Sequence, residues 1–174
     1  AYVGDGNLRY IDSLGNDHLV VGGENPAKSY GVADFIAAEE MGRRRGYWWS
    51  PEGNRLLVTE VDESDVVVWH ILNSSDPSSQ PRTLRYPKAG TNNPYVGLSI
   101  YALDGDVVPI DWTQKNFWEY LVNVQWTEES EIYLTVQNRN QTSMGILRVD
   151  SVTGDVEEIY RWTDEYWVEI ISGA

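Results

Sequence analysis

The sequence contains no cysteine, only two histidines and two phenylalanines, and no long hydrophobic run. Without cysteine, the chain can form neither a disulfide framework nor a thiolate metal site. No apolar run approaches the ~18–20 residues that would cross a bilayer, and the N-terminus lacks the basic-then-apolar pattern of a signal peptide. We therefore expect no membrane partner.

Positive charge is also scarce. The 174 residues carry 27 Asp plus Glu against 13 Lys plus Arg, which gives a net charge of −14. Nucleic acid is excluded as a partner, because phosphate contacts need a basic face. The 41% hydrophobic and 12% aromatic content, with eight Trp and eleven Tyr, is typical of a folded chain. At ~100–200 residues per domain, the length fits one domain or a piece of a larger one.

The hydrophobic periodicity is that of β-strands joined by short turns. Two hairpins are predicted, 96–112 around Gly105 and 146–162 around Gly154, because hairpin turns need the positive φ that glycine adopts. The two turn glycines lie 49 residues apart. This spacing is close to the ~40–50 residues of a four-stranded propeller blade. The sequence therefore predicts an all-β fold, part of a β-propeller.

A third pairing is predicted around four turn residues. The run 55–61 is rich in β-forming residues, and the run 66–71 follows almost at once. So short a connection favours a hairpin between the two runs. The run 82–86 could instead join 66–71 in a two-stranded arm, which would be marginal alone and would gain order by docking on a second subunit. A loose surface hairpin is the alternative for this arm.

The repeat divides the chain into parts of a propeller. A complete ring needs ~4–8 blades, so we expect about two to three four-stranded antiparallel blades and a fragment of a larger domain. Open blade edges invite pairing with another chain, so we expect the fragment to self-associate. Within the partial propeller 1–174 the expected parts are the end of one blade (1–23), an inserted helical segment (24–46), a blade (47–112) with an arm insertion (63–93), the next blade (119–162) and the start of a further blade (163–174).

The segment 32–44 has the one convincing helical pattern. On a helix, Glu39 and Glu40 lie four residues before Arg43 and Arg44, so surface ion pairs worth ~0.2–0.5 kcal/mol each are one interpretation. The other is that two adjacent carboxylates, about 100° apart around the helix, converge on one cation. A primary ammonium has three N–H donors, so two carboxylates suit a free peptide N-terminus. On spacing alone, surface ion pairs are favoured.

A wider motif surrounds this acidic pair. Glu39-Glu40-Met41 is followed by Arg43 and then by Gly46-Tyr47-Trp48-Trp49-Ser50-Pro51, and a second segment runs from Tyr86-Pro87-Lys88 to residue 96. In this order and spacing the segments resemble the N-terminal β-propeller of the dipeptidyl peptidase IV family. These proteins are serine exopeptidases of the prolyl oligopeptidase clan. The similarity extends over nearly the whole chain.

The resemblance implies a role for the acidic pair. In the family, the double-Glu motif lies on a short inserted helix that faces the catalytic cavity. It binds the α-ammonium of a peptide substrate with a free N-terminus, which fixes cleavage after the second residue, usually Pro or Ala. This role would fall to Glu39 and Glu40, with Arg43 and Arg44 as possible orienting residues. The family also implies a homodimer contact through the arm 63–93.

The chemistry is expected elsewhere. The family's catalytic Ser, Asp and His lie in a C-terminal α/β-hydrolase domain, and this sequence does not contain its Gly-x-Ser-x-Gly elbow. We therefore assign no catalytic residue here and expect the parent protein, not this segment alone, to be a serine-type dipeptidyl peptidase. His18 and His70 lack metal-ligand spacing and are interpreted as structural or surface residues. No metal or cofactor is expected.

Two other functions stay open. One is a non-catalytic propeller that serves as a protein-binding scaffold. The other is a carbohydrate-active propeller, which needs paired carboxylates ~5–10 Å apart on different strands. No spacing in the sequence supports the second, so it ranks last.

Overall fold

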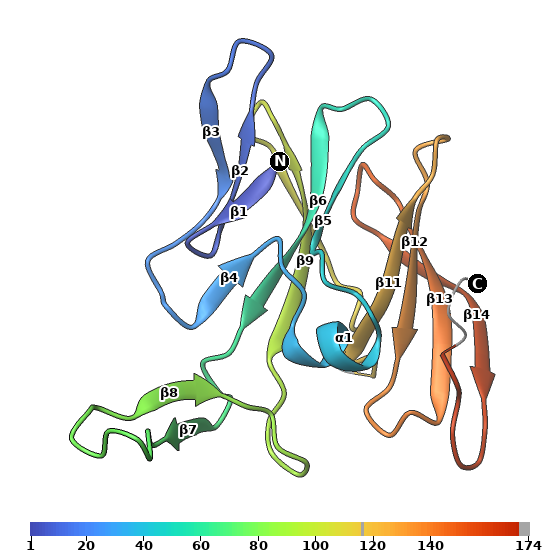
Figure 1. The fold of residues 1–174 in the computed structure, drawn as a ribbon. Helices are drawn as coiled ribbons and strands as arrows, with labels where there is room; N and C mark the ends of the chain where they lie inside the picture. Colours follow the sequence, from blue (N-terminus) through green and yellow to red (C-terminus); the bar gives the residue numbers. More distant parts are fainter. Residues whose placement is uncertain (116, 171–174) are drawn as a thin grey trace.

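The computed structural model describes residues 1–115 and 117–170. Figure 1 shows their fold, which consists of antiparallel strands and one short helix. The elements are β1 (Tyr2–Gly4), β2 (Asn7–Ile11), β3 (Asp17–Val21), β4 (Lys28–Tyr30), α1 (Phe35–Glu40), β5 (Tyr47–Trp49), β6 (Arg55–Asp62), β7 (Val68–Ile71), β8 (Arg82–Arg85), β9 (Tyr95–Ala102), β10 (Val107–Ile110), β11 (Tyr120–Trp126), β12 (Ile132–Gln137), β13 (Ser143–Val149) and β14 (Val156–Thr163).

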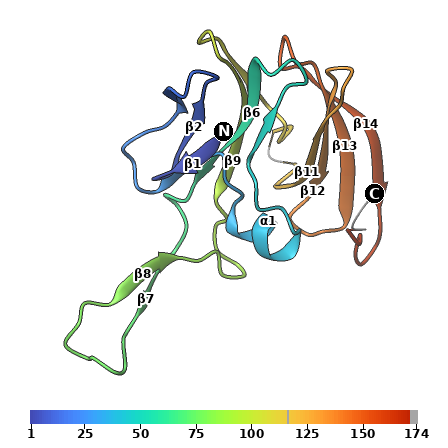
Figure 2. The same ribbon diagram turned by 45° about the horizontal axis from the view of Figure 1, so that its top comes forward.

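The strands form three sheets that lie side by side and a separate two-stranded arm (Figures 1 and 2). The first sheet has the order β1-β2-β3, and the third has the order β11-β12-β13-β14. The second sheet has the order β10-β9-β6-β4, with β5 also paired to β6. The arm consists of β7 and β8 and projects away from the sheets. The fold is therefore all-β and is part of a β-propeller, as predicted.

Both glycine-turn hairpins are confirmed. Strand β9 pairs with β10, and β13 pairs with β14, each antiparallel across its glycine turn. In the first hairpin Tyr101 lies opposite Val107, and Gly105 has a φ of 109°. Gly154 in the second turn has a φ of 79°. The turns therefore take the conformation for which the sequence supplies glycine.

The predicted hairpin between 55–61 and 66–71 is wrong. Strand β6 pairs along its whole length with β9, from Arg55 opposite Ala102 to Asp62 opposite Tyr95. The run 66–71 leaves the sheet instead, and β7 pairs with β8. The physical reason is burial, because β6 is covered on both faces whereas every residue of β7 is exposed. A strand that pairs with β6 inside the sheet has to be covered as well, and β7 is not.

Strand β6 supplies side chains to two separate cores. Leu57 points into the larger core between the second and third sheets, which includes Trp112 and Trp118. Leu56 and Val58 alternate with it and join Leu8 in a smaller core against the first sheet. Trp48 packs on the larger core and Trp49 on the smaller one. The adjacent tryptophans thus help to hold the blades together.

The helix is shorter than predicted. The sequence indicated a helix over 32–44, but α1 covers Phe35–Glu40 and ends at Met41, and Gly42 has a φ of 69°. The three arginines consequently lie beyond the helix, and no ion pair joins Glu39 to Arg43 or Glu40 to Arg44. Within the described residues, no helix is long and apolar enough to cross a membrane.

Candidate functional site

Helix α1 lies between the second and third sheets, at their lower edge in Figure 2. It contacts β11 of the third sheet, and Ala37 on its inner face is 1% exposed. Glu39 and Glu40 are both exposed at its C-terminal end. The helix therefore buries one side and leaves two adjacent carboxylates exposed.

A buried arginine holds the segment after the helix. Arg43 donates from Nη2 to Oδ1 of Asp34 at 3.2 Å, from Nε to the carbonyl of Leu121 at 3.1 Å and from Nη1 to the carbonyl of Arg45 at 3.1 Å. Only 8% of the residue is exposed. Burial lowers the pKa of the guanidinium, and the Asp34 carboxylate opposes that shift. Loss of either partner would leave an uncompensated buried charge.

Asp34 also begins the helix. It is the N-cap residue, and its Oδ2 accepts the backbone N–H of Ala37 at 3.2 Å. The carbonyl of Ala37 in turn accepts the backbone N–H of Met41 at 3.3 Å and that of Arg43 at 3.0 Å. One carboxylate thus joins the start of the helix to the loop after its end. Glu39 and Glu40 thus lie on a helix whose start and end are linked by hydrogen bonds.

The residues between β4 and β5 leave the second sheet and return to it at a neck formed by Gly31, Gly46 and Thr59. Gly46 N–H donates to the carbonyl of Gly31 at 3.0 Å, and Gly31 N–H donates to the carbonyl of Thr59 at 2.9 Å. The hydroxyl of Thr59, which is fully buried, donates to the carbonyl of Val32 at 2.7 Å. A Cβ on Gly46 would lie 2.3 Å from that carbonyl oxygen, so only glycine fits.

The other two arginines make different contacts. The Arg45 guanidinium lies over the ring of Tyr47, 5.8 Å from its centroid. Arg44 is exposed and forms no ion pair with either glutamate. Of the two arginines predicted to orient the acidic pair, only Arg43 is in contact with the helical segment through its side chain.

A pocket of about 260 Å³ opens at the C-terminal end of α1. Glu40 lines this pocket, whereas Glu39 does not. The opposite side is formed by Gln137, at the end of β12, and by the segment 167–170. Gln137 lies 97 positions and Trp167 lies 127 positions after Glu40, so the sequence motif gave no signal for them. We call this space the helix-end pocket.

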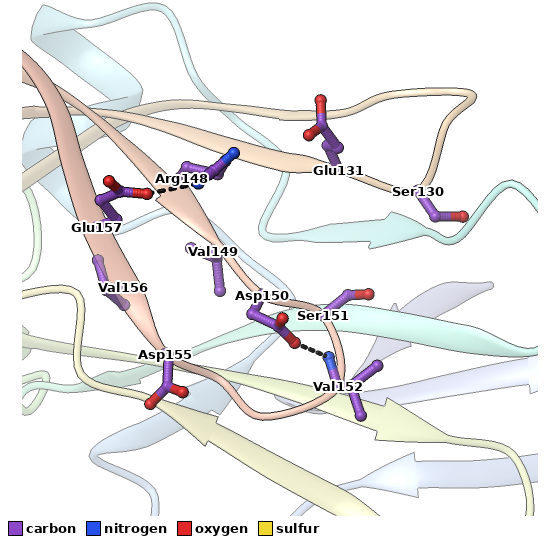
Figure 3. Close-up of a pocket in the computed structure, with 10 residues that line it drawn as sticks. All are labelled: Ser130, Glu131, Arg148, Val149, Asp150, Ser151, Val152, Asp155, Val156 and Glu157. Carbon is purple, nitrogen blue, oxygen red and sulfur yellow. Dashed lines mark hydrogen bonds and ion pairs between the residues drawn. The ribbon is translucent and has the colours of Figure 1, made fainter.

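Figure 3 shows a different pocket, about 450 Å³ in volume, on the third sheet. Arg148 donates from Nη2 to Oε2 of Glu157 at 2.5 Å. The backbone N–H groups of Thr153 and Val152 donate to Asp150 and lower the pKa of its carboxyl group. No group of three or more potential metal ligands occurs in the described part of the chain. This pocket shares no residue with α1.

The histidines lie apart from the acidic pair. His18 stacks on Tyr10 with a centroid separation of 4.8 Å, and its Nε2 lies 2.9 Å from Oδ2 of Asp12. That contact is the largest cause of a pKa of Asp12 far below its usual range, and hydrogen bonds from Asn16 are the next largest. His70 is exposed on β7 of the arm. Neither histidine is near α1 in the sequence or joined to it by a hydrogen bond.

Sheets arranged as blades, with an acidic helix inserted in the middle one, define a segment of β-propeller. A family model described as "Dipeptidyl peptidase IV (DPP IV) N-terminal region" matches residues 1–172. The chain therefore belongs to this family. The resemblance drawn from the double-Glu motif and from residues 86–96 is confirmed at the level of the family.

Curated relatives carry related names. Human dipeptidyl peptidase 8 is 29% identical in a match that covers 84% of this chain and 21% of the relative. Dipeptidyl aminopeptidase B of Saccharomyces cerevisiae is 26% identical over 163 residues, with 87% and 20% covered. Inactive dipeptidyl peptidase 10 of Rattus norvegicus is 24% identical over 177 residues, with 96% and 22% covered. The chain spans about a fifth of the length of these relatives.

A solved structure shares the fold. The crystal structure of Porphyromonas gingivalis dipeptidyl peptidase 4 superposes with a TM-score of 0.85 at 21% sequence identity. The superposition covers 95% of this chain and 24% of that chain. At this identity the likeness establishes the propeller architecture.

Proposed function

We propose that this chain is the substrate-gating segment of a dipeptidyl-peptidase-IV-like serine exopeptidase, in which Glu39 and Glu40 bind the α-ammonium of the peptide. A C-terminal α/β-hydrolase domain of the same protein would supply the catalytic Ser, Asp and His and release Xaa-Pro or Xaa-Ala dipeptides. The observation that carries the proposal is the pair of adjacent exposed carboxylates on a helix tied down by a buried ion pair.

The chemistry of the pair suits an ammonium group. A primary ammonium has three N–H donors, and two carboxylates can accept two of them while a third remains for another group. In a desolvated cavity each charge-assisted bond is worth about 1.5–3 kcal/mol. Holding the ammonium at a fixed distance from the scissile carbonyl turns binding energy into orientation. Cleavage after the second residue then follows from length alone.

Arg43 is the positioning residue in this proposal. Its guanidinium contacts the N-cap Asp34 and the carbonyl of Leu121, so the start of the helix and the loop after it are both fixed to the next blade. The direction of the Glu39 and Glu40 side chains depends on that placement. Arg44 makes no comparable contact, and we propose no orienting role for it.

The direct test is hydrolysis of a Xaa-Pro anilide by the full-length protein, with a free and with an acetylated N-terminus. Cleavage of the free form alone supports an exopeptidase that recognises the ammonium. Cleavage of both forms at similar rates would refute ammonium recognition. Cleavage of neither by a folded protein would favour a binding protein.

A second candidate function is a non-catalytic propeller scaffold. The observation in its favour is that the chain is similar over 96% of its length to a relative named inactive dipeptidyl peptidase 10. A similar segment therefore occurs both in relatives named as peptidases and in relatives named inactive. The presence or absence of a nucleophilic Ser in the downstream coding region separates the two candidates.

For the arm we propose a homodimer contact. Strands β7 and β8 carry apolar side chains that are largely uncovered, among them Trp69 at 43% and Ile71 at 51% exposed. Arg85 fastens the base of the arm through hydrogen bonds from Nη1 to the carbonyls of Glu63 and Val66. An isolated two-stranded ribbon is marginal in water, so docking on a second copy would stabilise it.

A further inference from the structure

The helix-end pocket has an unusual chemical lining. Three segments surround it, namely the end of α1, the turn between β12 and β13, and the stretch after β14. The lining residues are Glu40, Met41, Gly42, Gln137, Gln141 and Trp167–Ile170. None of these side chains is a cation and two are carboxylates, so the pocket favours a positively charged group.

The far wall of the pocket is held in place by hydrogen bonds. Val168 N–H donates to the carbonyl of Gln141 at 2.9 Å, and Gln137 donates from Nε2 to the carbonyl of Val168 at 3.0 Å. Oδ1 of Asp164 accepts the backbone N–H of Trp167 at 3.1 Å. The segment after β14 is therefore fastened to the end of the third sheet, and the wall is preformed.

Gln137 contributes an unused acceptor. The residue is 1% exposed, and its Oε1 has no hydrogen-bond partner. Because Nε2 is committed to the Val168 carbonyl, the amide cannot turn over to relieve this. Buried polar groups are almost always satisfied, so each exception calls for an explanation. Because Gln137 lines the pocket, its unpaired carbonyl oxygen adds to the attraction for a cation.

Trp167 and Glu169 complete the site. The indole of Trp167 is 58% exposed, and its Nε1 donates to Oε2 of Glu169 at 3.1 Å. This bond holds a carboxylate at the edge of an exposed indole ring. A cation over an aromatic face is stabilised by the quadrupole of the ring, and a neighbouring carboxylate reinforces the effect. Lysine and arginine side chains are the peptide groups that match this combination.

We propose that the helix-end pocket receives the cationic side chain of Lys or Arg at the first position of the peptide, so that substrates beginning with a basic residue are preferred. This inference rests on the proposed function. The first side chain leaves the same Cα that carries the α-ammonium. If Glu39 and Glu40 hold that ammonium, the side chain emerges next to Glu40, which lines the pocket.

The test compares substrates that differ at the first residue only. The full-length protein is assayed with Lys-Pro, norleucine-Pro and Glu-Pro anilides, because norleucine keeps the length of lysine without its charge. We expect kcat/KM for Lys-Pro to exceed that for norleucine-Pro by roughly five- to tenfold, the combined size of a cation–π contact and an exposed ion pair. Glu-Pro should be the poorest of the three. A Lys-to-norleucine ratio of one or less would overturn the proposal.

Variants locate the preference. Glu169→Gln and Trp167→Leu should each lower the Lys-to-norleucine ratio toward one. Glu165→Gln is the matched control, because Glu165 is an exposed acid of the same segment that does not line the pocket. The control removes the same net charge and should leave the ratio unchanged. An equal fall in the Lys-to-norleucine ratio with Glu165→Gln would show that overall charge causes the preference. It would overturn the proposal for the helix-end pocket.

The two proposals fail in different ways. Equal cleavage of free and acetylated substrates would refute ammonium anchoring by Glu39 and Glu40. Retained discrimination against acetylated substrates, with a Lys-to-norleucine ratio of one, would refute the pocket alone. If no anilide is cleaved, calorimetric titration of Lys-Pro and norleucine-Pro into the full-length protein decides. Equal affinities overturn the pocket, whereas tighter Lys-Pro binding that Glu169→Gln removes supports it.

Discussion

Two insertions interrupt the second sheet, and they differ in almost every physical respect. The helical insertion runs between β4 and β5, returns to the sheet at the neck and buries an ion pair between Asp34 and Arg43. The arm runs between β6 and β9 and leaves its apolar side chains exposed. The two meet at one point, where Tyr86 lies edge-on between Phe35 and Trp69.

The difference indicates what each insertion needs. A group that must sit at a fixed distance from a reacting bond has to be held by its own domain, and the helical insertion uses a buried charge pair for this. A surface that binds another copy needs uncovered apolar area instead. The arm therefore leaves its apolar side chains uncovered, whereas the helical insertion is held by the buried pair of Asp34 and Arg43. Stability should be sensitive to mutation in the first and association in the second.

The largest effect is expected at Arg43. Replacing one partner of a buried ion pair leaves the other charge without compensation, so Arg43→Met should lower the free energy of unfolding by about 3–5 kcal/mol. Arg44→Met is the control, since an exposed residue without an ion pair should change stability by no more than about 0.5 kcal/mol. Urea unfolding of both variants measures the difference. Equal midpoints would contradict the anchoring role of Arg43.

The next effect concerns activity without stability. Glu39→Gln or Glu40→Gln in the full-length protein should lower kcat/KM for a Xaa-Pro anilide by roughly 10²-fold or more, about 3 kcal/mol. Both side chains are exposed, so the melting temperature should stay close to that of the wild type. Steady-state kinetics and thermal unfolding are measured on the same preparations. Activity within threefold of wild type in both variants would end the proposal.

The smallest effect belongs to the arm. Trp69→Glu places a charge on the exposed apolar face and should weaken dimerisation of the full-length protein at least tenfold, about 1.4 kcal/mol, with little effect on unfolding. Gln80→Glu, an exposed change in the loop of the arm, is the control. Sedimentation velocity over a range of concentrations gives the association constant. A wild-type monomer at all concentrations would show that the arm has another role.

Much of the fold could be predicted because it depends on local signals. Glycine turns at Gly105 and Gly154 fixed two hairpins, and their spacing indicated blades. The pairing of β6 could not be predicted, because its partner β9 follows only after the whole arm. Proximity along the chain favoured 66–71, and only burial on both faces of β6 distinguishes the two partners.

The site was predictable in part for the same reason. Glu39 and Glu40 stand out as neighbours within a motif. The contacts of Arg43 do not, because its guanidinium donates to the carbonyl of Leu121, 78 residues further along the chain. Gln137 and Trp167 belong to unrelated segments that meet the helix only in the folded molecule. Their place beside Glu40 is a property of the tertiary structure.

The neck also determines how the sequence of the helical insertion can change in evolution. Because Gly31 and Gly46 are hydrogen-bonded to each other and to Thr59, the residues between them begin and end at nearly the same place. We therefore expect that a segment of another length or composition could replace them while β4 and β5 keep their pairing with β6. The second sheet thus provides a fixed point of attachment, and the helical insertion is the replaceable segment. Gly46, which has no room for a side chain, and Gly31, which has a φ of 75°, must be kept in every such exchange.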